Sequence, residues 1–428
     1  MSSDQTTPKR SRPIGTFDTF ALGINGVIGS GIFFLPSIGD KLLGPAAVLA
    51  TLLAGVLAWM IASAFGDVSV FYRRNGGAYI YTRDNFGAGP GFVVGWMTWL
   101  VAVTSWGALL NALFLALSGL SGTFSDPTIR SLGMSLLVVL LVVFNIRGLR
   151  LGASVSTTLT VLKATPLVIL AVIGLPEIEF AHFAPFSPHG WNGFADATLL
   201  ILYAYVGFES LVVPSAEIQN APKTMPRLLP NLLVSVTVLY LILQMVCISS
   251  LSDLGERDNP IAESAQVLLG DTLGAVFLWV SVVSVLGVNA GTALVTPRRL
   301  AALADEGDAP KVLGRRHSRY DTPAVAIALT GLAALLFALA GSFKELALMS
   351  VVARFVQYLP TCWLSLRGVG GGELNINSSG RLKAGIALLV SLALLVVADR
   401  EKLLAGGVGV GALSLVYLFV AHKRTHSK

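Results

Sequence analysis

The chain has 428 residues, of which 54% are hydrophobic and only 13% charged, whereas a soluble chain carries about 25% charged residues. This composition excludes an ordinary soluble enzyme, a disordered protein and a collagen-like fibre. Both cysteines, Cys247 and Cys362, lie in apolar stretches, so we expect no disulfide framework and no metal site. Basic loops are the usual topology signal of a membrane protein, so the net charge of +6 does not indicate a nucleic-acid partner.

Twelve long apolar runs follow one another along the chain. Each is close to the length of about 20 residues that a helix needs to cross a bilayer core roughly 30 Å thick. None alternates in polarity as a transmembrane β-strand would. We therefore predict an all-α integral membrane protein with twelve transmembrane helices, at about 17–37, 45–70, 88–118, 129–146, 153–175, 194–216, 230–250, 273–300, 323–341, 345–366, 382–398 and 403–421.

Lys and Arg are unevenly divided between the loops on the two sides of these helices. With both termini on one side, that side carries 22 of these residues and the opposite side carries 6. Cytoplasmic loops carry the excess of basic residues in membrane proteins. We therefore predict a multi-pass protein of the plasma (cytoplasmic) membrane, with cytoplasmic tails at residues 1–13 and 422–428.

Two of the predicted helices are interrupted in the same way. The first contains the sequence NGVIGSG at 25–31, with Pro36 five residues beyond Gly31. The sixth contains YAYVGFE at 203–209, with Pro214 five residues beyond Glu209. Glycines weaken a helix and permit an unwound stretch. Interrupted helices at corresponding positions of two halves indicate a transporter site near the bilayer midplane.

A break in a helix exposes two opposite poles. The downstream half presents free N–H groups and a positive dipole end, and the upstream half presents free carbonyls. An amino acid zwitterion carries both complementary charges a few ångströms apart, and so fits such a pair of poles. The alternative is that the glycines only allow close packing between helices.

These residues belong to an ordered set of motifs: Gly29-Ser30-Gly31, Gly76-Gly77-Ala78-Tyr79, Asn145-Ile146-Arg147-Gly148, Lys163-Ala164-Thr165-Pro166, Gly207-Phe208-Glu209, Glu217 to Pro226 and Ala304-Asp305-Glu306-Gly307. Over nearly the whole chain this set resembles the amino acid–polyamine–organocation superfamily. The resemblance implies a LeuT-type fold with discontinuous helices 1 and 6. Helices 1–5 and 6–10 would form a 5+5 inverted repeat, with helices 11 and 12 peripheral. It implies one transporter domain at 14–421, with repeat one at about 14–176, repeat two at about 190–367 and the peripheral helices at about 380–421.

The resemblance also implies roles at the two breaks. The amides of Ser30 and Gly31 would hold the substrate carboxylate, and Phe208 would close over the substrate as an aromatic gate. The carbonyls that would hold the substrate ammonium are those of Val27, Tyr203 and Val206. Further residues expected at the site are Ile28, Gly29 and Gly207 at the breaks, and Thr104, Trp106, Asn289 and Thr292 near the side-chain pocket.

Lys163 lies near the middle of the fifth predicted helix. A charged side chain there costs several kcal/mol unless it is paired or solvated, so a functional role is the default hypothesis. The resemblance implies that its ammonium occupies the place where sodium-coupled relatives bind an ion, near the carbonyls of Ile24 and Val27 and a hydroxyl of helix 8. Ser284 is the better candidate for that hydroxyl and Ser281 the weaker. The lysine would carry a coupling proton or act as a permanently charged strut; snorkelling or packing is the structural alternative.

Two further charged residues lie inside predicted helices. Glu209 follows the second break, where an anion is favoured; it could be a proton site, a gate, a partner for a cationic substrate or a structural acceptor. Arg354, in the tenth helix, could pair with Glu209, bind an acidic substrate or reach the external surface. If Arg354 lines the pocket, it disfavours cationic substrates.

We predict a secondary active transporter of amino acids that works by alternating access, with proton-coupled uptake through Lys163. Sodium-independent exchange, of amino acid for amino acid or for amine, is the alternative. A channel would need a continuous polar stripe, and an enzyme would need a nucleophile–base or metal constellation at depth; neither pattern is present. A substrate-sensing receptor on the same fold stays open. The expected partners are an amino acid, a proton and the bilayer, with no cofactor; the sequence leaves the oligomeric state and the individual substrate open.

Overall fold

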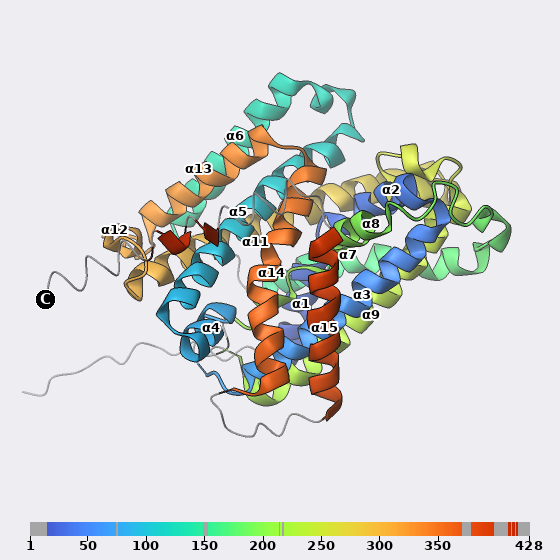
Figure 1. The fold of residues 1–428 in the computed structure, drawn as a ribbon. Coiled ribbons are helices and arrows are strands. Elements are labelled where there is room, and N and C mark those ends of the chain that lie inside the picture. The colour runs from blue at the N-terminus through green and yellow to red at the C-terminus, as the bar shows by residue number, and fades with distance from the viewer. Residues whose placement is uncertain are drawn as a thin grey trace, which may run out of the picture.

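The computed structural model describes residues 15–73, 76–148, 153–213, 215, 218–369, 378–397, 410–411, 413–415 and 417. Within these residues the secondary-structure elements are all helices (Figure 1). The two predicted tails, most of the predicted run at 403–421, Pro214 and Glu217 lie outside the described residues.

Seven helical segments within the described residues are long and apolar enough to cross a membrane. A further apolar helix, Ala324–Ala340, is slightly shorter. This is the profile of a multi-pass membrane protein. The seven segments are Gly31–Ser69, Ala88–Ser118, Pro127–Ile146, Thr160–Glu177, Ala221–Ser250, Asp271–Asp305 and Ser378–Val396.

Each of the first eleven predicted runs contains at least one helix. The main elements are α1 (Thr16–Val27), α2 (Gly31–Leu43), α3 (Ala47–Ser69), α4 (Ala78–Phe86), α5 (Ala88–Ser118), α6 (Pro127–Ile146), α7 (Ala153–Gly174), α8 (Phe194–Leu202), α9 (Ala221–Ser250), α10 (Pro260–Leu269), α11 (Asp271–Asp305), α12 (Lys311–Gly314), α13 (Ala324–Ala340), α14 (Phe343–Arg367) and α15 (Ser378–Val397). Two short 3-10 turns matter for the site, η5 (Tyr203–Tyr205) and η6 (Phe208–Ser210).

Two helices extend beyond the apolar runs that predicted them. The α9 helix begins at Ala221 rather than near residue 230, and α11 continues to Asp305 rather than ending at 300. Arg298 and Arg299, at the end of the predicted run at 273–300, therefore lie well inside the helix. An apolar run marks only the part of a helix that suits lipid or core, whereas backbone hydrogen bonds continue through polar residues.

Two of the helices, α6 and α14, begin with a side-chain cap. The Asp126 side chain accepts hydrogen bonds from the backbone N–H groups of Thr128 and Ile129, at 2.9 and 3.0 Å, and begins α6. Ser342 and Glu345 form a reciprocal capping box at the start of α14. Both arrangements satisfy N–H groups that would otherwise have no acceptor at a helix start.

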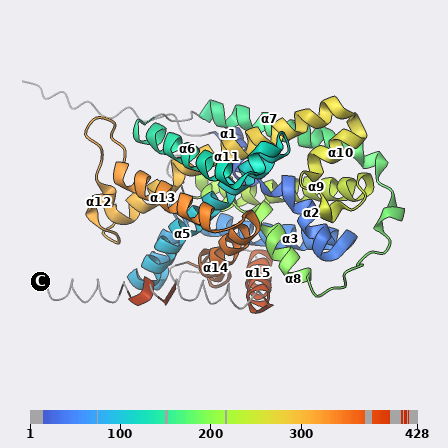
Figure 2. The same cartoon turned by 90° about the horizontal axis from the view of Figure 1, so that it is seen from above.

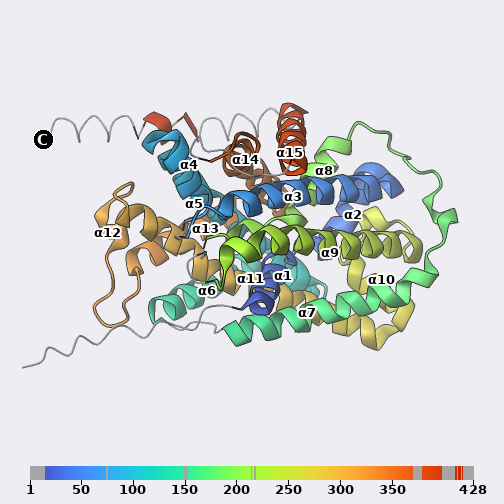
Figure 3. The same ribbon diagram turned by 90° about the horizontal axis from the view of Figure 1, so that it is seen from below.

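The helices form one bundle. In Figure 3, α3, α9 and α7 run across the view, and the contacts pair α3 with α9, α9 with α7, and α7 with α1. On the other flank α13 packs against α6, α5 and α11 (Figure 2). The short helices α4 and α12 lie at one end and α10 at the other, which we call the α4 end and the α10 end (Figure 3).

Candidate functional site

The first predicted break is present. The α1 helix ends at Val27 and α2 begins at Gly31. Between them Ile28 leaves the helical conformation, with ψ at 87°. The amides of Gly29, Ser30 and Gly31 lie before the first full turn of α2, so that helix offers them no carbonyl one turn earlier.

The second predicted break is also present. The α8 helix ends at Leu202 and continues as η5 for one turn. Val206 is then extended, Gly207 has φ at 114°, and η6 follows. That value of φ lies in the left-handed region, where a side chain is disfavoured and glycine is not. A glycine is therefore required at this position.

The two breaks contact each other directly. A Cβ atom added to Gly207 would lie 2.4 Å from the carbonyl oxygen of Gly26. A Cβ atom added to Gly31 would lie 2.7 Å from the Cα of Ala204. Close packing through small residues and interruption of the helices, which the sequence analysis weighed as alternatives, therefore occur together.

The carbonyl pole of the first break is occupied by the buried ammonium of Lys163. Its Nζ donates to the carbonyl oxygens of Asn25 and Ile28, at 2.8 and 2.5 Å. The predicted acceptors, near Ile24 and Val27, are displaced by one residue. The Ile24 oxygen accepts the N–H of Ile28, at 2.8 Å, and the Val27 oxygen accepts from the Tyr240 hydroxyl at 3.5 Å.

The predicted contact between Lys163 and a hydroxyl of α11 is not formed. Ser281 donates to the carbonyl of Leu278 at 2.7 Å. The Ser284 hydroxyl is buried and has no hydrogen-bond partner within the described residues. Thr160, one turn before Lys163, instead donates to the carbonyl of Ala21 at 3.1 Å. Two adjacent turns of α7 thus bind α1.

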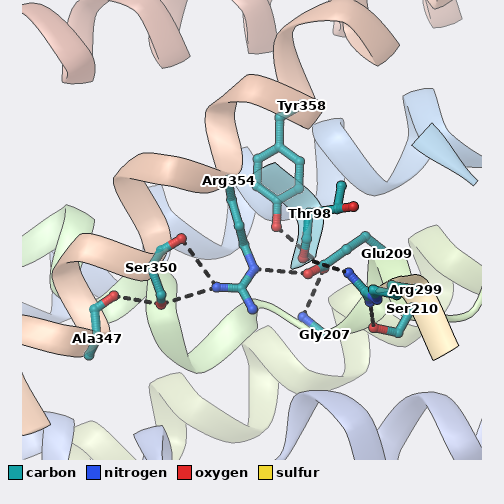
Figure 4. A network of polar contacts seen from close by, with 9 residues as sticks. All are labelled: Thr98, Gly207, Glu209, Ser210, Arg299, Ala347, Ser350, Arg354 and Tyr358. Carbon is teal, nitrogen blue, oxygen red and sulfur yellow. Dashed lines mark hydrogen bonds and ion pairs between the residues drawn. The ribbon is translucent and has the colours of Figure 1, made fainter. Parts of the chain in front are cut away.

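The amide pole of the second break is occupied by Glu209. Its Oε2 accepts from the backbone N–H of Gly207 at 2.9 Å and from the Tyr358 hydroxyl at 3.3 Å. Its Oε1 pairs with Nε of Arg354 at 2.9 Å (Figure 4). Nη1 of Arg354 also donates to the carbonyl and the hydroxyl of Ser350, at 3.3 and 3.1 Å. Of the roles weighed for Arg354, the structure shows internal pairing and not exposure at an external surface.

A cavity of about 350 Å³ lies where the breaks meet α5 and α11. Its charged side chains are Glu209, Arg299 and Arg354. The predicted residues that line it are Val27, Gly29, Ser30, Gly31, Tyr203, Val206, Gly207, Glu209, Thr292 and Arg354.

Four predicted pocket residues do not line this cavity. Ile28 is buried and uses its carbonyl for Lys163. Thr104 donates to the carbonyl of Leu100, at 2.9 Å. Trp106 is 1% exposed and packs in a core cluster built from α5, α6, α11 and α13. Asn289 donates to the carbonyls of Leu109 and Val285, at 3.0 and 2.9 Å, and so ties α11 to α5.

Phe208 also lies away from the cavity wall. The turn at Gly207 directs its ring toward α3 and α14, where it stacks on Tyr358 with a centroid separation of 5.9 Å. Phe65 packs edge-on against the same ring, also at 5.9 Å. Phe208 is 1% exposed. In this conformation it is a core residue and does not cover the cavity as the predicted gate would.

Arg299 is a charged cavity residue that was not among the predicted site residues. Its Nη2 donates to the Ser210 hydroxyl at 3.0 Å, and its Nη1 donates to the carbonyl of Thr98 at 3.3 Å (Figure 4). Thr292, Val295, Thr296 and Arg299 all line the cavity and stand at the i, i+3, i+4, i+7 spacing of one helix face. The predicted run at 273–300 contains all four positions, so this spacing in the sequence could have placed Arg299 on the same helix face as Thr292.

A second cavity, of about 640 Å³, adjoins the first on the side of the α4 end. Both cavities are lined by Glu209, Ser210, Val295 and Arg299. These four residues form the boundary between the central space and the space toward the α4 end.

Ion pairs tie α4 to the segment after α11 at the outer part of this second cavity. Arg83 pairs with Asp308 at 2.9 Å and with Glu306 at 3.5 Å. The Tyr79 hydroxyl donates to Asp308 at 2.8 Å. Burial and the Asp308 carboxylate raise the pKa of Tyr79, so the phenol keeps its proton and remains a donor.

Comparison with known proteins gives one family and several relatives. The family model described as amino acid permease matches residues 14–421. An uncharacterized transporter from Mycobacterium tuberculosis is 29% identical over 445 residues, which cover 95% of this chain and 92% of the relative. A branched-chain amino acid permease from Lactococcus lactis is 28% identical over 343 residues, covering 71% and 70%. A serine/threonine exchanger from Bacillus subtilis is 28% identical over 369 residues, covering 81% of each chain.

Proposed function

The chain belongs to the amino acid permease family, and we propose that it carries amino acids across the membrane by alternating access, with uptake coupled to protons through Lys163. Its substrate would bind in the central cavity, between the two helix breaks. The substrate carboxylate would take the amides at Ser30 and Gly31, and its ammonium the carbonyls of the second break.

The observation that carries this proposal is the complementary occupation of the two breaks. Lys163 occupies the carbonyl pole of the first break, and Glu209 occupies the amide pole of the second. The amide pole of the first break and the carbonyl pole of the second stay available, and residues of both line the same cavity. A zwitterion offers a negative and a positive group to that pair of poles.

Proton coupling would work through the contacts of Lys163. A protonated ammonium binds two carbonyls at the end of α1 and stabilises them as a cation would. Loss of the proton removes that charge and weakens both contacts, which frees α1 to shift relative to α7. A lysine at this position also leaves no vacancy for a sodium ion, so uptake would not require sodium.

The finer architecture is part of the same proposal. Twelve spans in the LeuT-type arrangement, with repeats at about 14–176 and 190–367, account for two breaks at corresponding positions. By the excess of basic residues, the α4 end and both termini would lie in the cytoplasm. Because the second cavity lies toward that end, the structure would correspond to a state in which the site communicates with the cytoplasm.

The test is uptake of labelled amino acids by the purified protein in liposomes. Uptake should increase with an inward pH gradient and persist without sodium. Lys163→Gln should abolish the response to the gradient and keep most substrate binding. Lys344→Gln, at an exposed lysine, is the control and should behave as the parent protein. Gradient-driven uptake by Lys163→Gln equal to that of the parent would remove Lys163 from the coupling role.

Exchange is the second candidate, and the relative named as a serine/threonine exchanger favours it. In an exchanger Lys163 would keep its proton and hold α1 to α7 throughout the cycle. Uptake would then require an amino acid or an amine inside the liposome and would ignore the pH gradient. Liposomes preloaded with and without amino acid separate the two mechanisms.

A further inference from the structure

Among the residues that the structure describes, the wall of the central cavity carries one negative and two positive side chains. These are Glu209, Arg299 and Arg354. Glu209 and Arg354 are 4% and 7% exposed by side chain and form a 2.9 Å ion pair, so they neutralise each other. Arg299 remains as the uncompensated cation.

The hydrogen bonds and the ion pair of Glu209 go to groups other than Arg299. Its Oε1 is taken by Arg354, and its Oε2 accepts from Gly207 and Tyr358. Within the described residues, none of the ion pairs joins Arg299 to a carboxylate. Its two hydrogen bonds go to neutral oxygens, and its Nε is buried without a partner in that part of the chain.

A guanidinium without a carboxylate partner inside a membrane protein costs free energy, and such a group as a rule faces a water-filled cavity or a charged partner. A carboxylate is the partner that suits it best, because the planar fork of a guanidinium makes two parallel charge-assisted hydrogen bonds with it. The Ser210 hydroxyl, already 3.0 Å from Nη2, lies beside the guanidinium and offers a further polar contact.

We propose that the central cavity selects amino acids whose side chain carries a carboxylate, and that Arg299 binds this second carboxylate. The inference rests on the proposed function, in which the α-carboxylate and the ammonium take the two helix breaks. A dicarboxylic amino acid carries one net negative charge and balances the cavity wall, whereas a neutral amino acid leaves Arg299 uncompensated.

The test compares two isosteric pairs in liposomes that contain the full-length protein: glutamate with glutamine, and aspartate with asparagine. The parent protein should take up at least one acid about tenfold faster than its amide, since a hydrogen bond between two charged groups is stronger than one to a neutral amide. Arg299→Gln should remove this preference by slowing the acid and leaving the amide within about twofold. Arg299→Lys, which keeps the charge and loses the fork, should fall between them.

Arg298→Gln is the matched control. Arg298 is the preceding residue of the same helix and donates to Oδ1 of Asn145 at 3.1 Å, and it lines the second cavity but not the central one. Its removal takes away the same charge and should leave the acid-to-amide ratio unchanged. Thermal unfolding with and without glutamate checks that each variant is folded. The acid-to-amide uptake ratio of the parent protein tests the acidic selectivity even if a variant does not fold.

The outcomes separate this inference from the proposed function. Uptake of neutral amino acids without acids by the parent protein would overturn the acidic selectivity and leave amino acid transport intact. A preference for acids that survives in Arg299→Gln, or disappears in Arg298→Gln, would overturn the role of Arg299. Failure to bind or transport any of the twenty amino acids would overturn the proposed function itself.

Discussion

The two helix breaks are built from similar glycine-containing sequences, yet the protein neutralises them in opposite ways. At the first break, a cation from another helix, Lys163 of α7, binds the exposed carbonyls. At the second, an anion from the break itself, Glu209, binds an exposed amide and is held in turn by Arg354 and Tyr358. Under the proposed function, each break would keep one pole for a ligand, and the two remaining poles would have opposite sign.

The two breaks are also stabilised by different interactions. The first depends on contacts between the Lys163 ammonium and two carbonyls, which loss of one proton would weaken. The second depends on a buried ion pair and a left-handed glycine, neither of which changes easily. We therefore expect the first break to be the moving part of the site and the second to be its rigid part.

The largest effect should come from splitting the ion pair of the rigid break. Arg354→Gln leaves Glu209 buried without its cation and should lower the free energy of unfolding by about 3–5 kcal/mol. The double variant Glu209→Gln/Arg354→Gln removes both charges and should recover most of that loss. Thermal unfolding in detergent measures the cycle, with Lys41→Gln at the exposed Lys41–Glu256 pair as a control of little effect. Equal losses in the single and the double variant would contradict the pairing.

A smaller loss of stability should follow from a methyl group at the contact between the breaks. Gly207→Ala places a side chain in the left-handed region and 2.4 Å from the Gly26 oxygen, which should cost at least about 2 kcal/mol. Gly26→Ala is the matched control. Gly26 lies inside α1, and its Cβ would be at an ordinary contact distance of 3.5 Å from the Gly207 oxygen. Similar unfolding temperatures for the two variants would show that the breaks can move apart at no cost.

The smallest effect on stability should come from Gly29, at the first break, where the functional effect should be large. A Cβ added at Gly29 would lie 3.9 Å from its nearest neighbour, the Val27 oxygen, so Gly29→Leu should change the free energy of unfolding by no more than about 0.5 kcal/mol. Its side chain would enter the central cavity and should abolish binding of a labelled amino acid. Normal binding by this variant would exclude the first break from the site.

Much of the fold could be predicted from the sequence. The lengths of the apolar runs determine where helices lie, because lipid leaves no other way to satisfy backbone groups over such a length. The glycines at 25–31 and at 203–209 determine where two of these helices are interrupted, because glycine weakens a helix and permits an unwound stretch. These signals are local, so a linear pattern contains them.

The direction of individual side chains could not be predicted in the same way. Trp106 and Phe208 belong to segments beside the cavity, and only the packing of α5 against α13 and the turn at Gly207 direct their rings elsewhere. Arg299 lies at the end of the predicted run at 273–300, and only the arrangement of the helices in space brings it to the cavity wall.

The sequence by itself determined that the chain is a helical membrane protein with two broken helices and ionisable groups beside them. The tertiary structure decided which charge meets which pole: Lys163 with the carbonyls of Asn25 and Ile28, Glu209 with Arg354, and Arg299 with no carboxylate within the part of the chain described. The physical reason is that helix formation depends on neighbours along the chain. The pairing of charges depends on distances of a few ångströms between helices that are more than a hundred residues apart in sequence.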